Sequence, residues 1–237
     1  MLVVASGAAW YWIALMGVDM YGAMTGASRW MMTPAWDAPH LALLFLMWTV
    51  MMAAMMLPSV SPLLLLYHAV AGRRATDGYR PSYVYAAAAG YLASWMLFSA
   101  GATVLQRVLT SAAVVNPMMA IASRRTGGLV LAAAGIYQML PIKQRCLSQC
   151  RAPVSFLTRY AQPGPAGAFR LGAHHGLYCV GCCWALMLLL LVGGVMNLWV
   201  IVGLAAFVAI EKLAPFGHAT SLAAGAALVI WGGWLAR

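Results

Sequence analysis

The chain has 237 residues, of which 64% are hydrophobic and 8% are charged, and its formal net charge is +10. A soluble domain carries about 25% charged residues, so this composition excludes an ordinary soluble domain and indicates a polytopic membrane protein. The Lys and Arg residues are scattered without a basic run, which excludes a nucleic-acid partner and makes positive charge a guide to membrane topology.

Long apolar runs predict an all-α polytopic transmembrane helical bundle of six or seven spans, forming one domain over residues 1–237. Only helices and closed barrels satisfy their backbone hydrogen bonds in lipid, and unbroken apolar runs favour helices. The fourth and sixth expected spans are short, which leaves the number open between six and seven. The spans are expected at about 1–18, 41–67, 83–105, 127–142, 176–195, 198–213 and 219–235.

The second expected span is rich in methionine. Pro58 and Pro62 lie near its end, where we expect the helix to kink or unwind. Thioethers bind Cu(I) without deprotonation, although methionine also simply fills membrane interiors. Further methionines, Met20, Met24, Met31 and Met32, lie in the preceding outer loop. The residues of a possible metal route are Met47, Met51, Met52, Met55, Met56, His40 and Asp37.

The distribution of positive charge predicts the orientation of the chain. With the N-terminus inside, more Lys and Arg residues lie on the cytoplasmic side than on the outer side. This orientation makes 143–175 a cytoplasmic loop. Thiols beside this loop would stay reduced and available as ligands.

All five cysteines fall in two clusters that flank this loop. Cys146 and Cys150 are four residues apart. His175, Cys179, Cys182 and Cys183 follow at i, i+4, i+7 and i+8, which places them on one stripe of a helix. Thiolates and imidazole suit copper or, as the alternative, zinc, whereas buried cysteines in helices can also serve as small apolar residues.

Charged residues near the clusters are expected to support the site. Lys143, Arg145 and Arg151 should lower the pKa of the neighbouring thiols. Glu211 and Lys212 end the sixth expected span on the same membrane face as the cysteines. We expect Glu211 to orient the ligands. The alternative is that both residues are interfacial, with Lys212 extending its ammonium to water.

Several blocks of the chain resemble a known family. They are WTVMMAAMMLP at 48–58, YQMLPIK at 137–143, HGLYCVGCCW at 175–184, GGVMN at 193–197, and Glu211-Lys212. Over about 35–215 the chain is similar to the bacterial family of predicted metal-binding integral membrane proteins, a domain of unknown function. The resemblance implies an inner-membrane location and a metal site that involves the cysteines, and it supplies no reaction.

Three functions remain open from the sequence. The first is transport or delivery of a soft metal, along a gradient from outer thioethers to inner thiolates, with a partner membrane protein or metal chaperone. The second is a membrane thiol-disulfide oxidoreductase that uses Cys146 and Cys150 with Cys182 and Cys183. The third is an accessory or assembly subunit of a copper enzyme. No nucleotide-binding or hydrolase motif occurs, which disfavours an enzyme.

Overall fold

The computed structural model describes residues 2–22, 24, 37–73, 82–116 and 118–237. The described residues form helices and no strand, which confirms the expected all-α class. Met31 and Met32 lie outside the described residues. The helices are α1 (Leu2–Tyr21), α3 (Ala38–Arg73), α4 (Tyr83–Ser111), α5 (Arg124–Met139), α6 (Pro141–Arg151), α7 (Pro153–Tyr160), α8 (Gly164–Leu188), α9 (Leu190–Gly193), α10 (Leu198–Leu213) and α11 (Gly217–Leu235).

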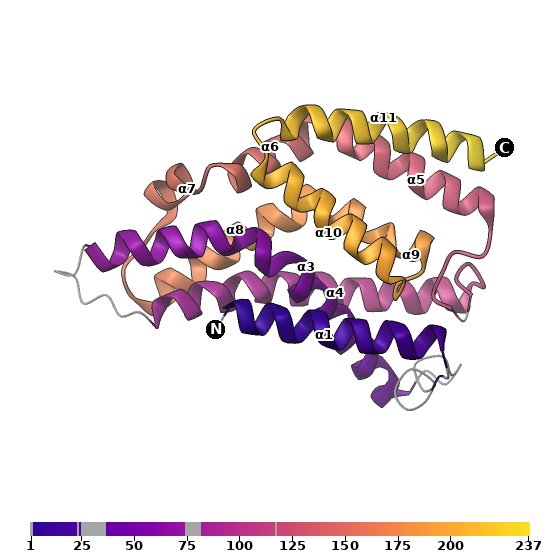
Figure 1. Ribbon diagram of the computed structural model, residues 1–237, viewed down its shortest axis with the longest axis horizontal. Coiled ribbons are helices and arrows are strands. Elements are labelled where there is room, and N and C mark those ends of the chain that lie inside the picture. The colour runs from indigo at the N-terminus through magenta and orange to yellow at the C-terminus, as the bar shows by residue number, and fades with distance from the viewer. Residues whose placement is uncertain (1, 23, 25–36, 74–81, 117) are drawn as a thin grey trace.

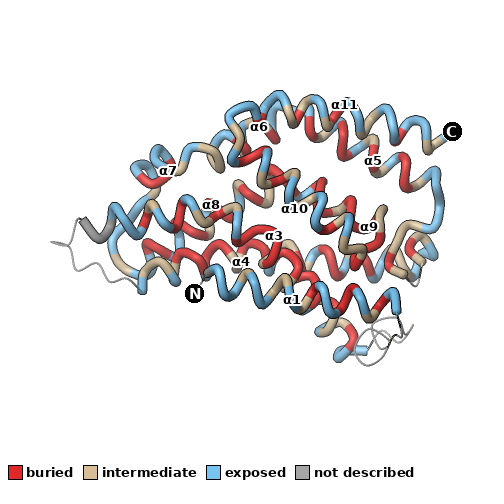
Figure 2. Tube along the Cα trace, in the orientation of Figure 1, coloured by how far each residue is buried: buried red, intermediate tan, exposed pale blue. Residues whose placement is uncertain are grey.

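The helices form a lower group, a central helix and an upper pair (Figure 1). In the lower group, α4 packs along α8, and α3 lies between α4 and α1. The upper pair consists of α5 and α11, and α10 crosses between the pair and the lower group. Figure 2 shows buried residues concentrated in α3, α4 and α8, whereas α1 and α11 present long exposed faces.

Four helical segments of the described chain are long and apolar enough to cross a membrane. They are Val3–Tyr21, Ala38–Val70, Tyr83–Ser111 and Gly164–Gly193. The expected spans at 127–142, 198–213 and 219–235 are also helical, as α5, α10 and α11, but their length and apolarity do not place them in this group. Four candidate spans are therefore supported, and the expected number of six or seven is not confirmed.

The expected loop at 143–175 is largely helical, so the sequence prediction is wrong there. It contains most of α6, all of α7 and the first turns of α8. Pro141 and Pro153 start α6 and α7. Proline suits this first helical position, because the amide that it lacks would have no intrahelical acceptor there. The segment is polar because its helices are exposed, and not because it lacks helical structure.

Prolines bend α3 without ending it. The helix continues through Pro58 and Pro62 to Arg73, so the chain does not unwind. Figure 1 shows α3 changing direction along its length. A proline removes one backbone hydrogen bond and crowds the preceding turn, which kinks a helix that other contacts hold in place. The expected kink is therefore present.

Glycines allow two pairs of helices to approach closely. A Cβ on Gly172 of α8 would lie 1.8 Å from the Ala87 carbonyl oxygen of α4, and a Cβ on Gly90 would lie 2.0 Å from the Phe169 carbonyl oxygen. In the upper pair, a Cβ on Gly128 of α5 would lie 2.6 Å from the Gly232 carbonyl oxygen of α11. Small residues of this kind let helix backbones touch in apolar surroundings.

Candidate metal centre

The cysteines of α8 face the interior of the bundle. Cys179, Cys182 and Cys183 are each 1% exposed, and His175 is 3% exposed. The Cys182 and Cys183 thiols donate to the Cys179 carbonyl oxygen at 3.1 and 2.7 Å, and the two sulfurs are 3.8 Å apart. These are the contacts of residues three and four positions apart on a helix. The single stripe expected from the spacing is thus buried as a unit.

Cys179 lies at the junction of four helices. The Tyr91 hydroxyl of α4 is 3.0 Å from its sulfur. The Lys212 ammonium of α10 donates to the same sulfur at 2.9 Å and to Ser59 Oγ of α3 at 3.2 Å. Lys212 is only 7% exposed, so the alternative in which it reaches toward water is wrong. The Cys179 sulfur therefore accepts from one cation and shares a hydrogen bond with one neutral hydroxyl, in which either atom can be the donor.

The second cysteine cluster, on α6, packs against α8. Cys146 Sγ lies 3.0 Å from the position that a Cβ on Gly181 would take, so the glycine leaves room for this sulfur. The Cys150 thiol interacts with the side chains of Cys179 and Cys182. All five cysteines are free. The structure thus brings the two clusters together although a helix, α7, separates them in the chain.

The basic residues of α6 do not activate its thiols, contrary to the sequence prediction. Hydrogen bonds with Cys179 and Cys182, together with burial, hold the pKa of Cys150 well above its usual value. Burial, with a smaller contribution from Cys182, raises the pKa of Cys146. Lys143 forms an ion pair with Glu211 instead. Arg151 donates to the backbone carbonyl oxygens of 214 and 215 at 2.6 and 2.9 Å.

The His175 imidazole has a free nitrogen in a buried position. Its ring packs edge-on against Phe156, with centroids 5.0 Å apart, and lies 6.0 Å from the Tyr91 ring. Its Nδ1 has no hydrogen-bond partner. An unsatisfied buried polar atom costs stability, about 1–3 kcal/mol, unless a ligand or water satisfies it. This nitrogen is one helical turn before Cys179 and has the chemistry of a metal ligand.

The donors are not arranged as a completed site. Within the described residues, no three His, Cys, Asp or Glu side chains are grouped so that they could hold a metal ion. Several sulfur atoms are instead engaged in hydrogen bonds with one another, with the backbone or with Lys212. The donor types nevertheless fit a soft cation, because thiol sulfur and imidazole nitrogen are the ligands that Cu(I) and Zn(II) favour.

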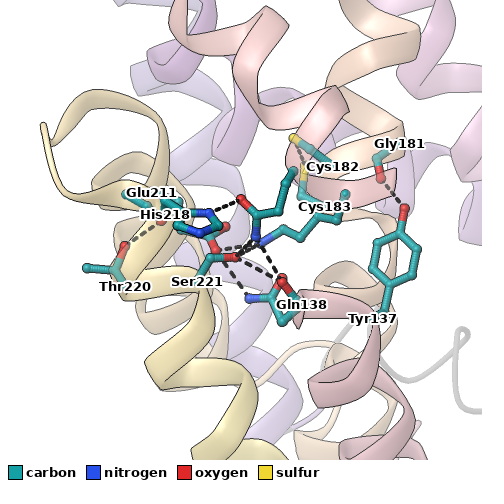
Figure 3. Close-up of polar contacts among 12 residues, drawn as sticks. Tyr137, Gln138, Gly181, Cys182, Cys183, Glu211, His218, Thr220 and Ser221 are labelled. Carbon is teal, nitrogen blue, oxygen red and sulfur yellow. Dashed lines mark hydrogen bonds and ion pairs between the residues drawn. The ribbon is translucent and has the colours of Figure 1, made fainter. Parts of the chain in front are cut away.

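Glu211 belongs to a buried polar network beside the cysteines (Figure 3). Its carboxylate accepts from Lys143 Nζ and from Gln138 Nε2, the latter at 3.3 Å. Lys143 also donates to Ser221 Oγ at 2.8 Å, and Ser221 donates to the Gln138 carbonyl oxygen at 3.2 Å. The network joins α5, α6, α10 and α11. None of these contacts of Glu211 is to a cysteine, so they do not orient a ligand directly as expected from the sequence.

The methionines of the expected route are buried on α3. Met47, Met51, Met52, Met55 and Met56 are at most 2% exposed. Met56 Sδ lies 4.0 Å from Lys212 Nζ, so this line reaches the surroundings of Cys179. His40, at the other end, is 2% exposed and lies about 24 Å along the helix from Met56, at 1.5 Å per residue. Asp37 is exposed, and its carboxylate caps α3 by accepting from the His40 amide at 3.0 Å.

Sequence reasoning missed two groups that contact this centre. Tyr91 is an uncharged aromatic residue, so the sequence does not mark it as part of a site. The small residues before it predict only that the helix packs closely against a neighbour. Ser59 lies between Pro58 and Pro62, and this proline-rich setting gives no indication that the hydroxyl contacts the centre. Neither contact follows from spacing, because each joins segments far apart in the chain.

The described chain is therefore an all-helical protein in which thiol and imidazole groups, the donors that soft metals favour, lie where several helices meet. A family profile described as "PpoB2: Copper chaperone" matches residues 45–235. This covers most of the chain, which therefore belongs to this copper chaperone family. The copper-related part of the sequence expectation is supported. No curated protein and no solved structure matches the chain.

Proposed function

We propose that the protein is a membrane-embedded copper chaperone that binds Cu(I) at the cysteine centre and delivers it to a partner. The ligands would be drawn from Cys150, Cys179, Cys182, Cys183 and His175, with Cys146 at the rim. The proposal is supported above all by one observation, the burial of three α8 cysteines in a core against which Cys150 of α6 packs. Copper is favoured over zinc because the family is copper-related and buried thioethers approach the centre.

The membrane location proposed is the bacterial inner membrane, crossed several times. The four candidate spans support it. We assign α5, α10 and α11 as three further spans. The 16 residues of α5 and of α10 each extend about 24 Å, less than the roughly 30 Å of a hydrocarbon core, so neighbouring helices would shield their ends. This arrangement puts α6 and α7 on the cytoplasmic side.

The methionine line of α3 is proposed as the path by which copper reaches the centre from the opposite side. Thioether ligands hold Cu(I) more weakly than thiolates do, so copper passing from Met47 toward Met56 would end at the cysteines. Delivery is preferred to bulk transport because the family is one of copper chaperones. The recipient would be a membrane copper protein or a soluble chaperone that exchanges ligands with the exposed side of α6.

Metal analysis of the purified protein tests this function. The protein is purified in detergent under reducing, anaerobic conditions, loaded with Cu(I), freed of excess metal and analysed for copper per chain. Replacing Cys179 and Cys182 by Ser should reduce bound copper about tenfold or more, because two ligands of one site are lost. Ser148→Ala, an exposed change on α6, is the control and should leave copper content unchanged.

Each other outcome contradicts the proposal in a distinct way. Equal copper in the double Ser variant would show that the centre is not the binding site. If the protein retained zinc and no copper, the centre would be a zinc site and the proposed copper function would be wrong. A reversible disulfide among these cysteines with no bound metal would favour the thiol oxidoreductase.

A further inference from the structure

The ammonium of Lys212 occupies an unusual position for a buried cation. Its contacts are the Cys179 sulfur at 2.9 Å, Ser59 Oγ at 3.2 Å and the Met56 thioether at 4.0 Å. No carboxylate among the described residues pairs with it, because the adjacent Glu211 is bound to Lys143. Burying a cation costs several kcal/mol unless partners compensate. The Cys179 sulfur is therefore its principal partner.

A metal ion on Cys179 would compete with this contact. A metal–thiolate bond is about 2.3 Å long, so a bound ion would lie within a few ångströms of an ammonium that stays 2.9 Å from the same sulfur. Two cations at such a separation repel strongly where water is scarce. The Tyr91 hydroxyl, at 3.0 Å, already takes another side of the sulfur. Charge repulsion would therefore weaken the contact between Lys212 and Cys179 when a metal ion binds this sulfur.

We propose that Lys212 is a resident cation that Cu(I) displaces from Cys179 and that returns to Cys179 when copper leaves. The inference rests on the proposed function and describes how its site is regulated. No electron is transferred. Cu(I) adds one positive charge while Lys212 stays charged on Ser59, and each thiol that becomes a ligand releases its proton, so the total charge of the centre changes little. The returning ammonium competes with copper for the thiol and so promotes transfer to the partner.

Ser59 provides a hydrogen-bond partner for the displaced side chain. Lysine has a flexible four-carbon stem, and its ammonium has three donors. Ser59 Oγ already accepts from Lys212, and it lies on α3, away from the cysteine stripe of α8. In the proposed exchange, a rotation of the stem keeps the Ser59 bond and releases Cys179.

Lysine NMR provides a direct test on the unmodified protein. The sequence contains two lysines, Lys143 and Lys212. In protein labelled with ¹⁵N-lysine, adding Cu(I), which is diamagnetic, should shift the Lys212 Nζ signal and leave the Lys143 signal in place. Lys212→Arg assigns the signal by removing it. A Lys212 signal that does not change while copper binds would overturn the inference.

Copper release provides the second test. The loaded protein is mixed with excess of a coloured Cu(I) chelator, and the release rate is followed. Lys212→Met and Lys212→Gln remove the cation and should slow release about tenfold, since most changes in affinity act on dissociation. Lys212→Arg keeps the cation and should release copper at nearly the wild-type rate.

The controls separate this inference from the proposed function. Tyr91→Phe removes the neutral hydrogen-bond partner of the same sulfur and should change release much less than Lys212→Met does. Equal or faster release from both neutral variants would overturn the inference while leaving the copper site intact. If the wild-type protein binds no copper at all, the proposed function itself fails.

Discussion

Glu211 and Lys212 are neighbours in the chain but serve different partners. Successive residues of a helix point about 100° apart, so one side chain faces Lys143 and Gln138 while the next faces Cys179. A carboxylate placed beside an ammonium in sequence would suggest that the two neutralise each other. Here Glu211 is committed to Lys143, which leaves Lys212 for the sulfur centre.

Removing one partner of the buried Lys143–Glu211 pair is expected to destabilise the protein strongly. Both side chains are at most 2% exposed. Glu211→Gln leaves the Lys143 ammonium buried without its counter-charge and should lower the free energy of unfolding by about 3–5 kcal/mol. Unfolding of the metal-free protein by denaturant in detergent measures this loss.

A double variant is the matched control for this pair. Combining Glu211→Gln with Lys143→Met removes the unpaired charge and should restore much of the lost stability. A loss in the single variant below about 1 kcal/mol, the range of exposed pairs, would mean that water reaches the ion pair.

At the scale of helices, the centre depends on how closely α4 and α8 pack. Gly90 precedes Tyr91 on α4, and Gly172 and Gly176 lie on the α8 face that approaches α4. With larger residues at these positions, the backbones would move apart, and the Tyr91 hydroxyl would lose its 3.0 Å contact with Cys179. The glycines therefore set the separation between the two sides of the centre.

Gly172→Ala tests the role of this packing. The added Cβ would lie 1.8 Å from the Ala87 carbonyl oxygen, so the helices must separate, and we expect a loss of about 1–3 kcal/mol from overpacking. Thermal unfolding in detergent measures the change. Gly101→Ala on α4 is the control, because nothing lies within 4 Å of its new Cβ.

The control should be neutral or stabilising by up to about 1 kcal/mol, the difference in helix propensity between Gly and Ala. If Gly172→Ala behaves like Gly101→Ala, the close packing of α4 and α8 contributes little.

How much the sequence predicts differs between helices and contacts. Apolar length predicts α1, α3 and α4, and spacing predicts that Cys179, Cys182 and Cys183 share one buried stripe. Polarity misleads for α6 and α7, whose exposed faces resemble a loop. The partner of Lys212 could not be predicted, because a contact between α8 and α10 depends on the packing of the whole bundle.

At the scale of the whole molecule, the two ends of the bundle differ. The N-terminus and α7 lie at one end in Figure 1, and the C-terminus and the turn after α9 lie at the other. Arg145, Arg151 and Arg159 belong to α6 and α7. In the proposed membrane protein, the positive-inside rule therefore makes the end with α7 cytoplasmic.

Membrane topology can be measured with single-cysteine labelling. In a cysteine-free chain, a cysteine in place of Gln162, between α7 and α8, should be protected from an impermeant thiol reagent in intact cells. A cysteine in place of Ala112, just after α4, should be labelled, because it lies beyond one further span. Labelling of Gln162→Cys with protection of Ala112→Cys would invert the direction of the proposed copper path.

The glycine contacts between α5 and α11 impose an order on biogenesis. A ribosome completes α5 well before it reaches α11, so the Gly128 surface has no companion while α8 and α10 are being synthesised. Contacts between such distant segments form late. In the nascent chain, α5 therefore lacks this partner until α11 has been synthesised, and the close glycine contact between the two helices forms only then.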